Sequence, residues 1–89
     1  MKYTVVWKPS VRDRLAEMWI DAPDRRAVSD AAHRIDQLLQ EGPADRGESR
    51  DEGTRILVEL PLAVVYEIAE DDRLVQVLAI RHVPTRPVD

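Results

Sequence analysis

TRILVELPLAVVYEIAEDDRLVQVLAIRHV, residues 54–83, is the stretch that decides the fold. It contains three runs rich in β-branched residues, separated by a Leu60-Pro61-Leu62 corner and by the charged segment 70–73. This pattern is typical of an antiparallel three-strand meander. The last run, 74–80, is apolar on both sides, which predicts a central strand. Polar groups that follow such a strand directly are the first place to look for a functional site.

Upstream of the meander, the sequence predicts a strand and a helical hairpin. Residues 2–7 alternate as a strand with one apolar face, and Pro9 is expected to end it. Ser10 is the predicted N-cap of a first helix over about residues 11–20. A second helix is expected to start at the 21–24 break and to end at Gly42 and Pro43.

The apolar positions of both predicted helices fall on one side. Those of the first are Val11, Leu15, Met18 and Trp19, and those of the second are Val28, Ala31, Ala32, Ile35, Leu38 and Leu39. Residues 44–53 are charged and are predicted to be an exposed loop. The prediction is one α+β domain, residues 1–89, of order β-α-α-β-β-β, with a helical hairpin packed on a small, mostly antiparallel sheet.

Composition limits the function classes. The chain has 89 residues, no cysteine and a formal net charge of -4, which opposes general nucleic-acid binding unless basic residues cluster locally. We expect no metal and no cofactor, because His33 and His82 lack ligand spacing and no glycine-rich phosphate loop occurs. No leader and no apolar run of about 18 residues is seen, so a cytoplasmic protein without a membrane partner is expected.

One group of residues could carry chemistry, and it consists of Arg55, Arg81, His82 and Arg86. If the first and last meander strands are near neighbours, these side chains share one end or face of the sheet. Arginines there would hold an RNA backbone, and the histidine would move a proton. The alternative is a set of solvated strand-end charges paired with Glu59 or Glu67. Tyr66, Trp7 and Trp19 are expected to be core residues rather than catalytic or partner-binding ones.

The chain resembles the RelE/ParE superfamily, the toxins of bacterial type II toxin–antitoxin modules, known also as plasmid stabilisation proteins. The resemblance spans nearly the whole chain and is carried by the element order and by the segments 53–57, 64–68 and 75–82. It implies a cognate antitoxin as partner, which is expected to dock in a groove offered by the helical hairpin and the open sheet edge. It also implies basic residues at Arg55 and in the segment after the last strand, Arg81 and His82. Where many relatives have an arginine, this chain has Ala63, and no tyrosine follows Arg81.

The two branches of this family act on different targets. RelE-like members cleave mRNA in the ribosomal A site, and ParE-like members poison DNA gyrase. The first expectation is therefore a translation inhibitor, a ribosome-dependent endoribonuclease with an incomplete catalytic set in Arg55, Arg81 and His82. The alternatives are a ParE-like gyrase inhibitor and a non-catalytic protein of the same fold that only binds a partner.

Overall fold

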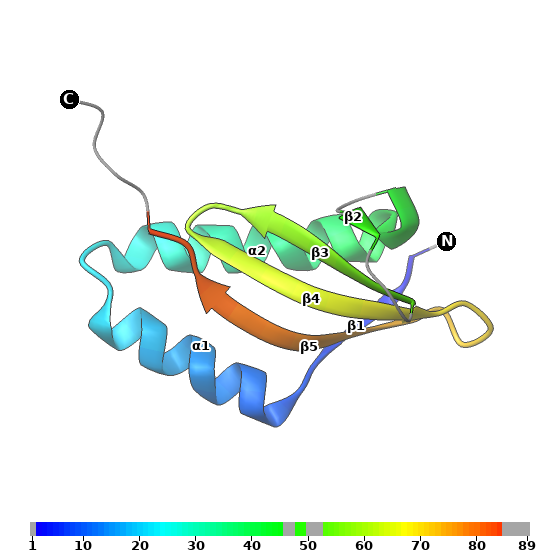
Figure 1. Cartoon of the computed structure of the whole chain (residues 1–89), viewed down its shortest axis with the longest axis horizontal. Coiled ribbons are helices and arrows are strands. Elements are labelled where there is room, and N and C mark those ends of the chain that lie inside the picture. Colours follow the sequence, from blue (N-terminus) through cyan, green and yellow to red (C-terminus); the bar gives the residue numbers. More distant parts are fainter. Residues whose placement is uncertain (1, 46–47, 50–52, 85–89) are drawn as a thin grey trace.

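The computed structural model describes residues 2–45, 48–49 and 53–84 (Figure 1). The elements in chain order are β1 (Thr4–Trp7), α1 (Pro9–Asp21), α2 (Arg25–Glu41), the short 3-10 helix η1 (Pro43–Asp45), β2 (Glu48–Ser49), β3 (Thr54–Glu59), β4 (Leu62–Ala69) and β5 (Leu74–His82). The order confirms the predicted α+β fold. The segment predicted to be a plain exposed loop instead contains η1 and the two-residue strand β2 within its described part.

The strands form one mixed sheet in the order β1-β5-β4-β3-β2. β1 runs parallel to β5, and the other neighbouring pairs are antiparallel. β5 lies between β1 and β4, which confirms the central strand predicted from its apolar sequence. The register of β4 and β5 shifts between Val65 and Tyr66, whose partners are Ala79 and Val77, so Leu78 is an extra residue in β5.

Both helices begin at residues that suit an N-terminus, but α1 begins earlier than the sequence indicated. Lys8 is the cap residue and Pro9 lies in the first turn, so the prediction that Ser10 caps this helix is wrong. Proline suits this position because its backbone angle is already helical and its missing N–H needs no partner. α2 follows the predicted start signal, because the Asp24 carboxylate accepts a hydrogen bond from the Ala27 N–H at 3.0 Å.

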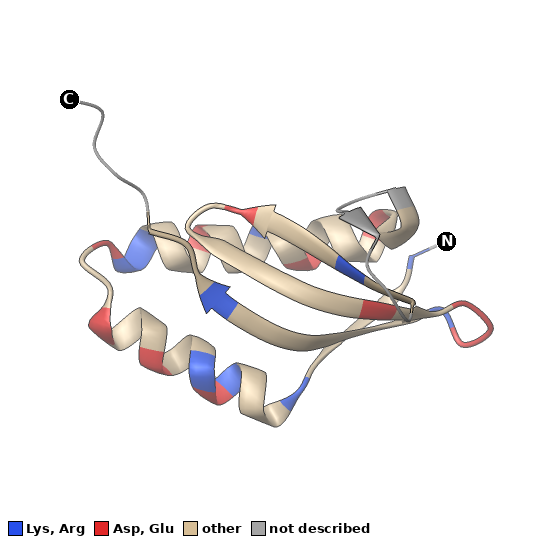
Figure 2. Cartoon of the chain, in the orientation of Figure 1, with Lys and Arg blue, Asp and Glu red and all other residues tan. Residues whose placement is uncertain are grey.

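The two helices pack on one side of the sheet, which we call the helix face; the other side is the open face. Figure 1 shows α2 behind β3 and β4, and α1 alongside β5. The hydrophobic core between these layers consists of Val11, Met18, Val28, Ala31, Ile35, Leu39, Leu57, Leu62, Val64, Tyr66, Val75, Val77 and Ile80. Charged residues gather on the helices and on the loop between β4 and β5, whereas the middle of the sheet is largely uncharged (Figure 2).

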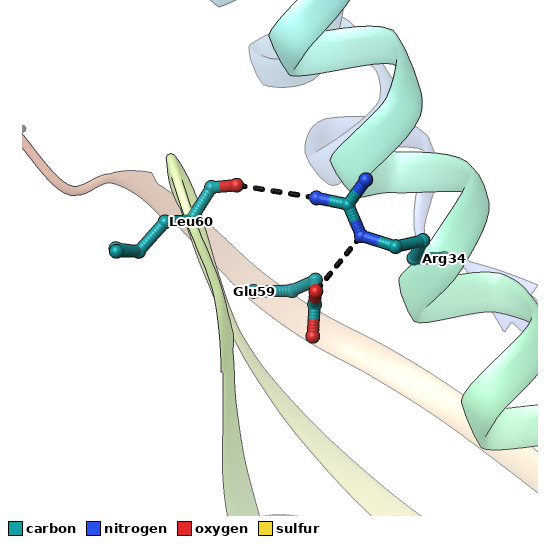
Figure 3. Close-up of polar contacts among 3 residues, drawn as sticks. All are labelled: Arg34, Glu59 and Leu60. Atoms are coloured by element: carbon teal, nitrogen blue, oxygen red, sulfur yellow. Dashed lines mark hydrogen bonds and ion pairs between the residues drawn. The ribbon is translucent and has the colours of Figure 1, made fainter.

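One polar contact joins α2 to the corner between β3 and β4 (Figure 3). Arg34 Nε donates to Glu59 Oε1 at 2.8 Å, and Arg34 Nη2 donates to the Leu60 carbonyl oxygen at 3.4 Å. The Arg34 side chain is 47% exposed and that of Glu59 is 29% exposed, so water screens the pair and its contribution to stability stays below about 1 kcal/mol. The contact therefore orients the corner more than it stabilises the fold.

Tyr66 joins the sheet to the segment after α2. Its side chain is fully buried, and its hydroxyl donates to the Pro43 carbonyl oxygen at 2.7 Å. Burial raises the pKa of Tyr66, and the neighbouring Arg55, through a hydrogen bond and its charge, offsets part of that rise. The expectation that Tyr66 is a core residue with a satisfied hydroxyl is confirmed.

The first prediction concerns the centre of α2. Ile35 is fully buried, so Ile35→Ala should lower the free energy of unfolding by about 2–5 kcal/mol through lost burial and a cavity. The same substitution at Ile20, which is 59% exposed, should change it by less than about 0.5 kcal/mol. Urea denaturation of the two variants and the wild type measures both values, and equal effects at the two sites would contradict the assigned core.

A second prediction concerns the Tyr66 hydroxyl. Tyr66→Phe should lower the free energy of unfolding at pH 7 by about 1–3 kcal/mol, because it leaves the Pro43 carbonyl without its donor. Since the folded pKa of Tyr66 lies above its usual 10.0, the stability linked to its neutral form is complete below pH 10 and is lost as the pH rises through the folded pKa. The variant has no hydroxyl to ionise and does not lose this stability. The difference in the free energy of unfolding between wild type and variant should therefore shrink in urea titrations at alkaline pH. Tyr3→Phe, which removes an exposed hydrogen bond to Glu70, is the control.

Candidate functional site

Arg55 is the second residue of β3 and lies on the helix face. It is directly opposite Tyr66 on β4, and directly opposed residues point to the same side of an antiparallel sheet. Arg55 also contributes to the environment of the Tyr66 hydroxyl described above. The structure therefore gives Arg55 a role beside the core, next to the buried tyrosine.

Arg81 lies on the open face, near the end of β5. It is directly opposite Ala63 and borders an apolar hollow of about 400 Å³. The hollow is lined by Ile56, Val58, Ala63, Val64, Val65, Ala79, Ile80, Arg81 and Val83. Arg81 is exposed and is thus a cation at the rim of an apolar surface. In the part of the chain that the structure describes, it forms no ion pair.

His82 follows Arg81 and points to the other side of the sheet. It is opposite Leu62, a fully buried residue of the helix face. The imidazole borders two shallow hollows next to the turn between α1 and α2, where Met18, Asp21 and Pro23 are among its neighbours. His82 is exposed, so a molecule that crosses this end of β5 can reach it.

The prediction that Arg55 shares one end or face of the sheet with the Arg81–His82 pair holds only for the face of His82. Arg55 and His82 both lie on the helix face, whereas Arg81 lies on the open face, and Arg55 is not at the strand end that carries the pair. The strand partners of Arg55 and Arg81 on β4 are Tyr66 and Ala63, which are three residues apart. An odd separation along a strand places two side chains on opposite faces, and three residues span about 10 Å. The structure therefore brings Arg81 and His82 to one strand end and leaves Arg55 elsewhere. Arg86, the fourth member of the predicted group, lies outside the described residues.

The alternative was that the strand-end arginines pair with Glu59 or Glu67, and for Glu59 the structure shows a different partner. The Glu59 carboxylate pairs with Arg34 of α2 rather than with an arginine of the sheet. Sequence periodicity could not find this partner, because the pairing depends on how α2 crosses the β3–β4 corner. Among the described residues, no group of three His, Cys, Asp or Glu side chains has the arrangement of a metal site. Neither helix in those ranges has the length and apolar content needed to span a bilayer.

A second surface feature lies between the two helices of the hairpin. It is a groove of about 590 Å³ lined by Trp7, Arg12, Leu15, Ala16, Trp19, Val28, Ser29, Ala32, His33 and Asp36. Trp19 is 40% exposed, so its assignment to the core stripe is wrong, whereas Trp7 is half-buried against the core. Both line the groove, although core packing was expected for both rather than a place on a partner-binding surface.

Polar contacts hold both tryptophan rings in the groove. Trp7 Nε1 donates to Asp36 Oδ1 at 3.1 Å, and Trp19 Nε1 donates to Ser29 Oγ at 2.9 Å. The guanidinium of Arg25 lies 4.8 Å from the centre of the Trp19 ring, within cation–π range. Fixed aromatic rings over an apolar floor are typical of protein-binding surfaces, because they offer contact area at little entropic cost.

The sequence matches no protein-family model and no curated protein at a significant level. The fold does resemble those of solved structures. A chain of the toxin–antitoxin complex RelBE2 from Mycobacterium tuberculosis superposes with a TM-score of 0.74 at 22% identity, over 92% of this chain and 99% of that one. A chain of the chromosomal ParDE toxin–antitoxin system from P. aeruginosa gives a TM-score of 0.72 at 18% identity, over 92% and 97%.

These two likenesses span nearly the full length of both chains compared, and they agree with the element order and sheet topology described above. At 22% and 18% identity, these likenesses show the fold alone. The protein has the RelE/ParE-like toxin fold.

Proposed function

We propose that this protein is the toxin of a type II toxin–antitoxin module, a growth inhibitor that a cognate antitoxin protein binds and neutralises. The observation that carries the proposal is the near-complete structural likeness to chains from two solved toxin–antitoxin systems. Two surfaces support it. One is the aromatic groove between α1 and α2, and the other is the rim of the sheet at Arg81 and His82.

The groove between the helices is the proposed antitoxin site. Its floor combines Leu15, Val28 and Ala32 with the two tryptophan rings, so it fits the apolar side of an amphipathic segment that becomes ordered on binding. Arg12 and Asp36 at its border provide one charge of each sign for the polar side of that segment. The occupant is thus a helix with apolar anchors and flanking charges.

The proposed action is inhibition of translation by cleavage of ribosome-bound mRNA at the end of β5. Arg81 would hold a phosphate and His82 would move a proton. The two side chains point to opposite faces, but they are the last two residues of the strand, so an RNA backbone that crosses this end reaches both. Arg55 takes no part in this version, because its partner on β4, Tyr66, lies away from the strand end, three residues from the partner of Arg81 and four from that of His82.

The second candidate is a non-catalytic inhibitor, such as a ParE-like gyrase inhibitor. It is favoured by the separation of Arg55 from Arg81, since a dispersed set of basic residues does not assemble a transition-state site. It also agrees with the acidic balance of the chain, because binding to a protein target does not depend on clustered cations.

The third prediction separates these mechanisms by induced expression in a bacterial host. Wild-type protein should stop growth and protein synthesis, and primer extension should show cleaved mRNA. Arg81→Ala and His82→Ala should each reduce cleavage by about 100-fold or more, as expected for loss of a charge-stabilising group or a general acid–base. Arg26→Ala, which removes an exposed arginine from the first turn of α2, should leave cleavage unchanged.

Three other outcomes are informative. Growth arrest with intact mRNA and reduced supercoiling by purified gyrase would replace the ribonuclease by the gyrase inhibitor. Arrest that both strand-end variants retain would remove Arg81 and His82 from the mechanism. Normal growth under full expression of the wild type would contradict the toxin proposal itself.

The fourth prediction concerns the groove and the product of a short reading frame adjacent to this protein's gene. Titration calorimetry should show that Trp19→Ala weakens its binding by tenfold or more, about 1.4 kcal/mol, because Trp19 is a fixed, 40% exposed ring. Ile20→Ala removes a neighbouring exposed side chain that does not line the groove, and it should change the affinity by less than about threefold. Equal effects of the two variants would place the antitoxin elsewhere.

A further inference from the structure

The open face of the sheet carries an apolar row at its centre. Strand pairing places Ile56, Val65 and Ala79 side by side across β3, β4 and β5. Alternation puts their side chains on the side away from the helices, since Leu57 and Val64, their neighbours in sequence, belong to the core. Val58 lies next to this row and is 53% exposed. In the described residues, no helix covers this surface, and an uncovered apolar patch is typical of an interaction site.

One charge lies at each end of the apolar row. Arg81 shares the row of Val58 and Ala63 at one end of the sheet, and Glu67 shares the row of Thr54 and Gln76 at the other. In Figure 2 a blue segment lies near the end of β5 and a red segment toward the end of β4, and the ribbon of both strands is uncharged in between. Both side chains are exposed, and within the described ranges neither forms an ion pair. Across β3, β4 and β5 the face therefore has a positive end, an apolar centre and a negative end.

Such a face is complementary to itself. A two-fold axis that lies between two copies and runs across the strands reverses the strand direction of the second copy. The apolar row then packs on the same row of the other copy, and the Arg81 end of each copy meets the Glu67 end of its partner. Stacked sheets lie about 10 Å apart, and Arg81 on β5 is offset by one strand, about 4.8 Å, from Glu67 on β4 of the other copy. Both side chains are long enough to pair across this distance.

We propose that the open face is the contact surface of a homodimer in which the apolar rows pack together and two symmetric Arg81–Glu67 pairs close the ends. A second copy fits this face better than a nucleic acid, because β3, β4 and β5 present only one cation here, offset by one carboxylate. The small side chains of Ala63 and Ala79 create the hollow of about 400 Å³ that receives the partner's apolar side chains. In this dimer Arg81 pairs with Glu67 of the partner subunit, so the form that would hold an RNA phosphate is the monomer; the tests below measure association alone and need no toxin activity.

A charge exchange tests the dimer by sedimentation equilibrium. Wild-type protein should reach twice the 10.2 kDa mass of one chain. Arg81→Glu and Glu67→Arg should each raise the dimer dissociation constant by about tenfold or more, because every substitution acts twice in a symmetric interface and turns attraction into repulsion. The double variant, which restores opposite charges, should recover most of the affinity. Arg26→Glu, at an exposed position on α2, should have no effect.

Chemical crosslinking supplies an independent test, because the natural sequence contains no cysteine. Val65→Cys puts a single thiol on the proposed axis, so a short bismaleimide should join two copies of this variant. Gln37→Cys, on the exposed side of α2, should remain uncrosslinked at the same concentration.

Two results would overturn the proposal. The first is a wild-type protein that stays monomeric at about 100 µM, a concentration at which an interface with a dissociation constant near 10 µM would be mostly occupied. The second is a dimer that both single charge variants retain and that Val65→Cys does not crosslink, since its interface would then lie on another surface.

Discussion

The packing of α2 across the helix face of the sheet is the interaction on which the rest of the structure depends. Val28, Ala31, Ile35 and Leu39 form one buried stripe along this helix, and they meet the buried residues of the central strands. A chain of this length has little core to spare, so this single layer contact carries much of the driving force for folding. The polar contact of Arg34 with Glu59 and Leu60 then fixes where the far corner of the sheet lies against the helix.

Because both helices share one side, the sheet divides the molecule into two distinct surfaces. The aromatic groove belongs to the helical hairpin, and the row of Ile56, Val65 and Ala79 belongs to the uncovered side. The end of β5 is where the two sides meet, since Arg81 faces one and His82 faces the other. A partner bound in the groove and a molecule bound on the open face can therefore occupy the protein together, and the strand end is where they would affect each other.

Much of the architecture follows from sequence pattern, but the placement of the predicted site residues does not. Apolar runs and turn residues predicted the element order, the central position of β5 and the start of α2 within the 21–24 break, because these depend on local chemistry. The relation between Arg55 and Arg81 depends on the pairing of two strands with β4, and one residue of register decides the face of every side chain. Trp19 was misassigned because an apolar stripe shows which side of a helix faces the core, but not how far along the helix the core extends.

The parallel pairing of β1 with β5 has a consequence for the timing of folding during synthesis. Thr4 finds its partner, Leu74, only after residue 74, seventy positions later in the sequence, has left the ribosome. Until then the first strand has no neighbour in the sheet, and the edge of β4 that β5 will cover is open. Contacts this distant in sequence form slowly. A nascent chain can build its helical hairpin early, but the finished sheet, and with it the strand end at Arg81 and His82, forms only after β5 has been synthesised.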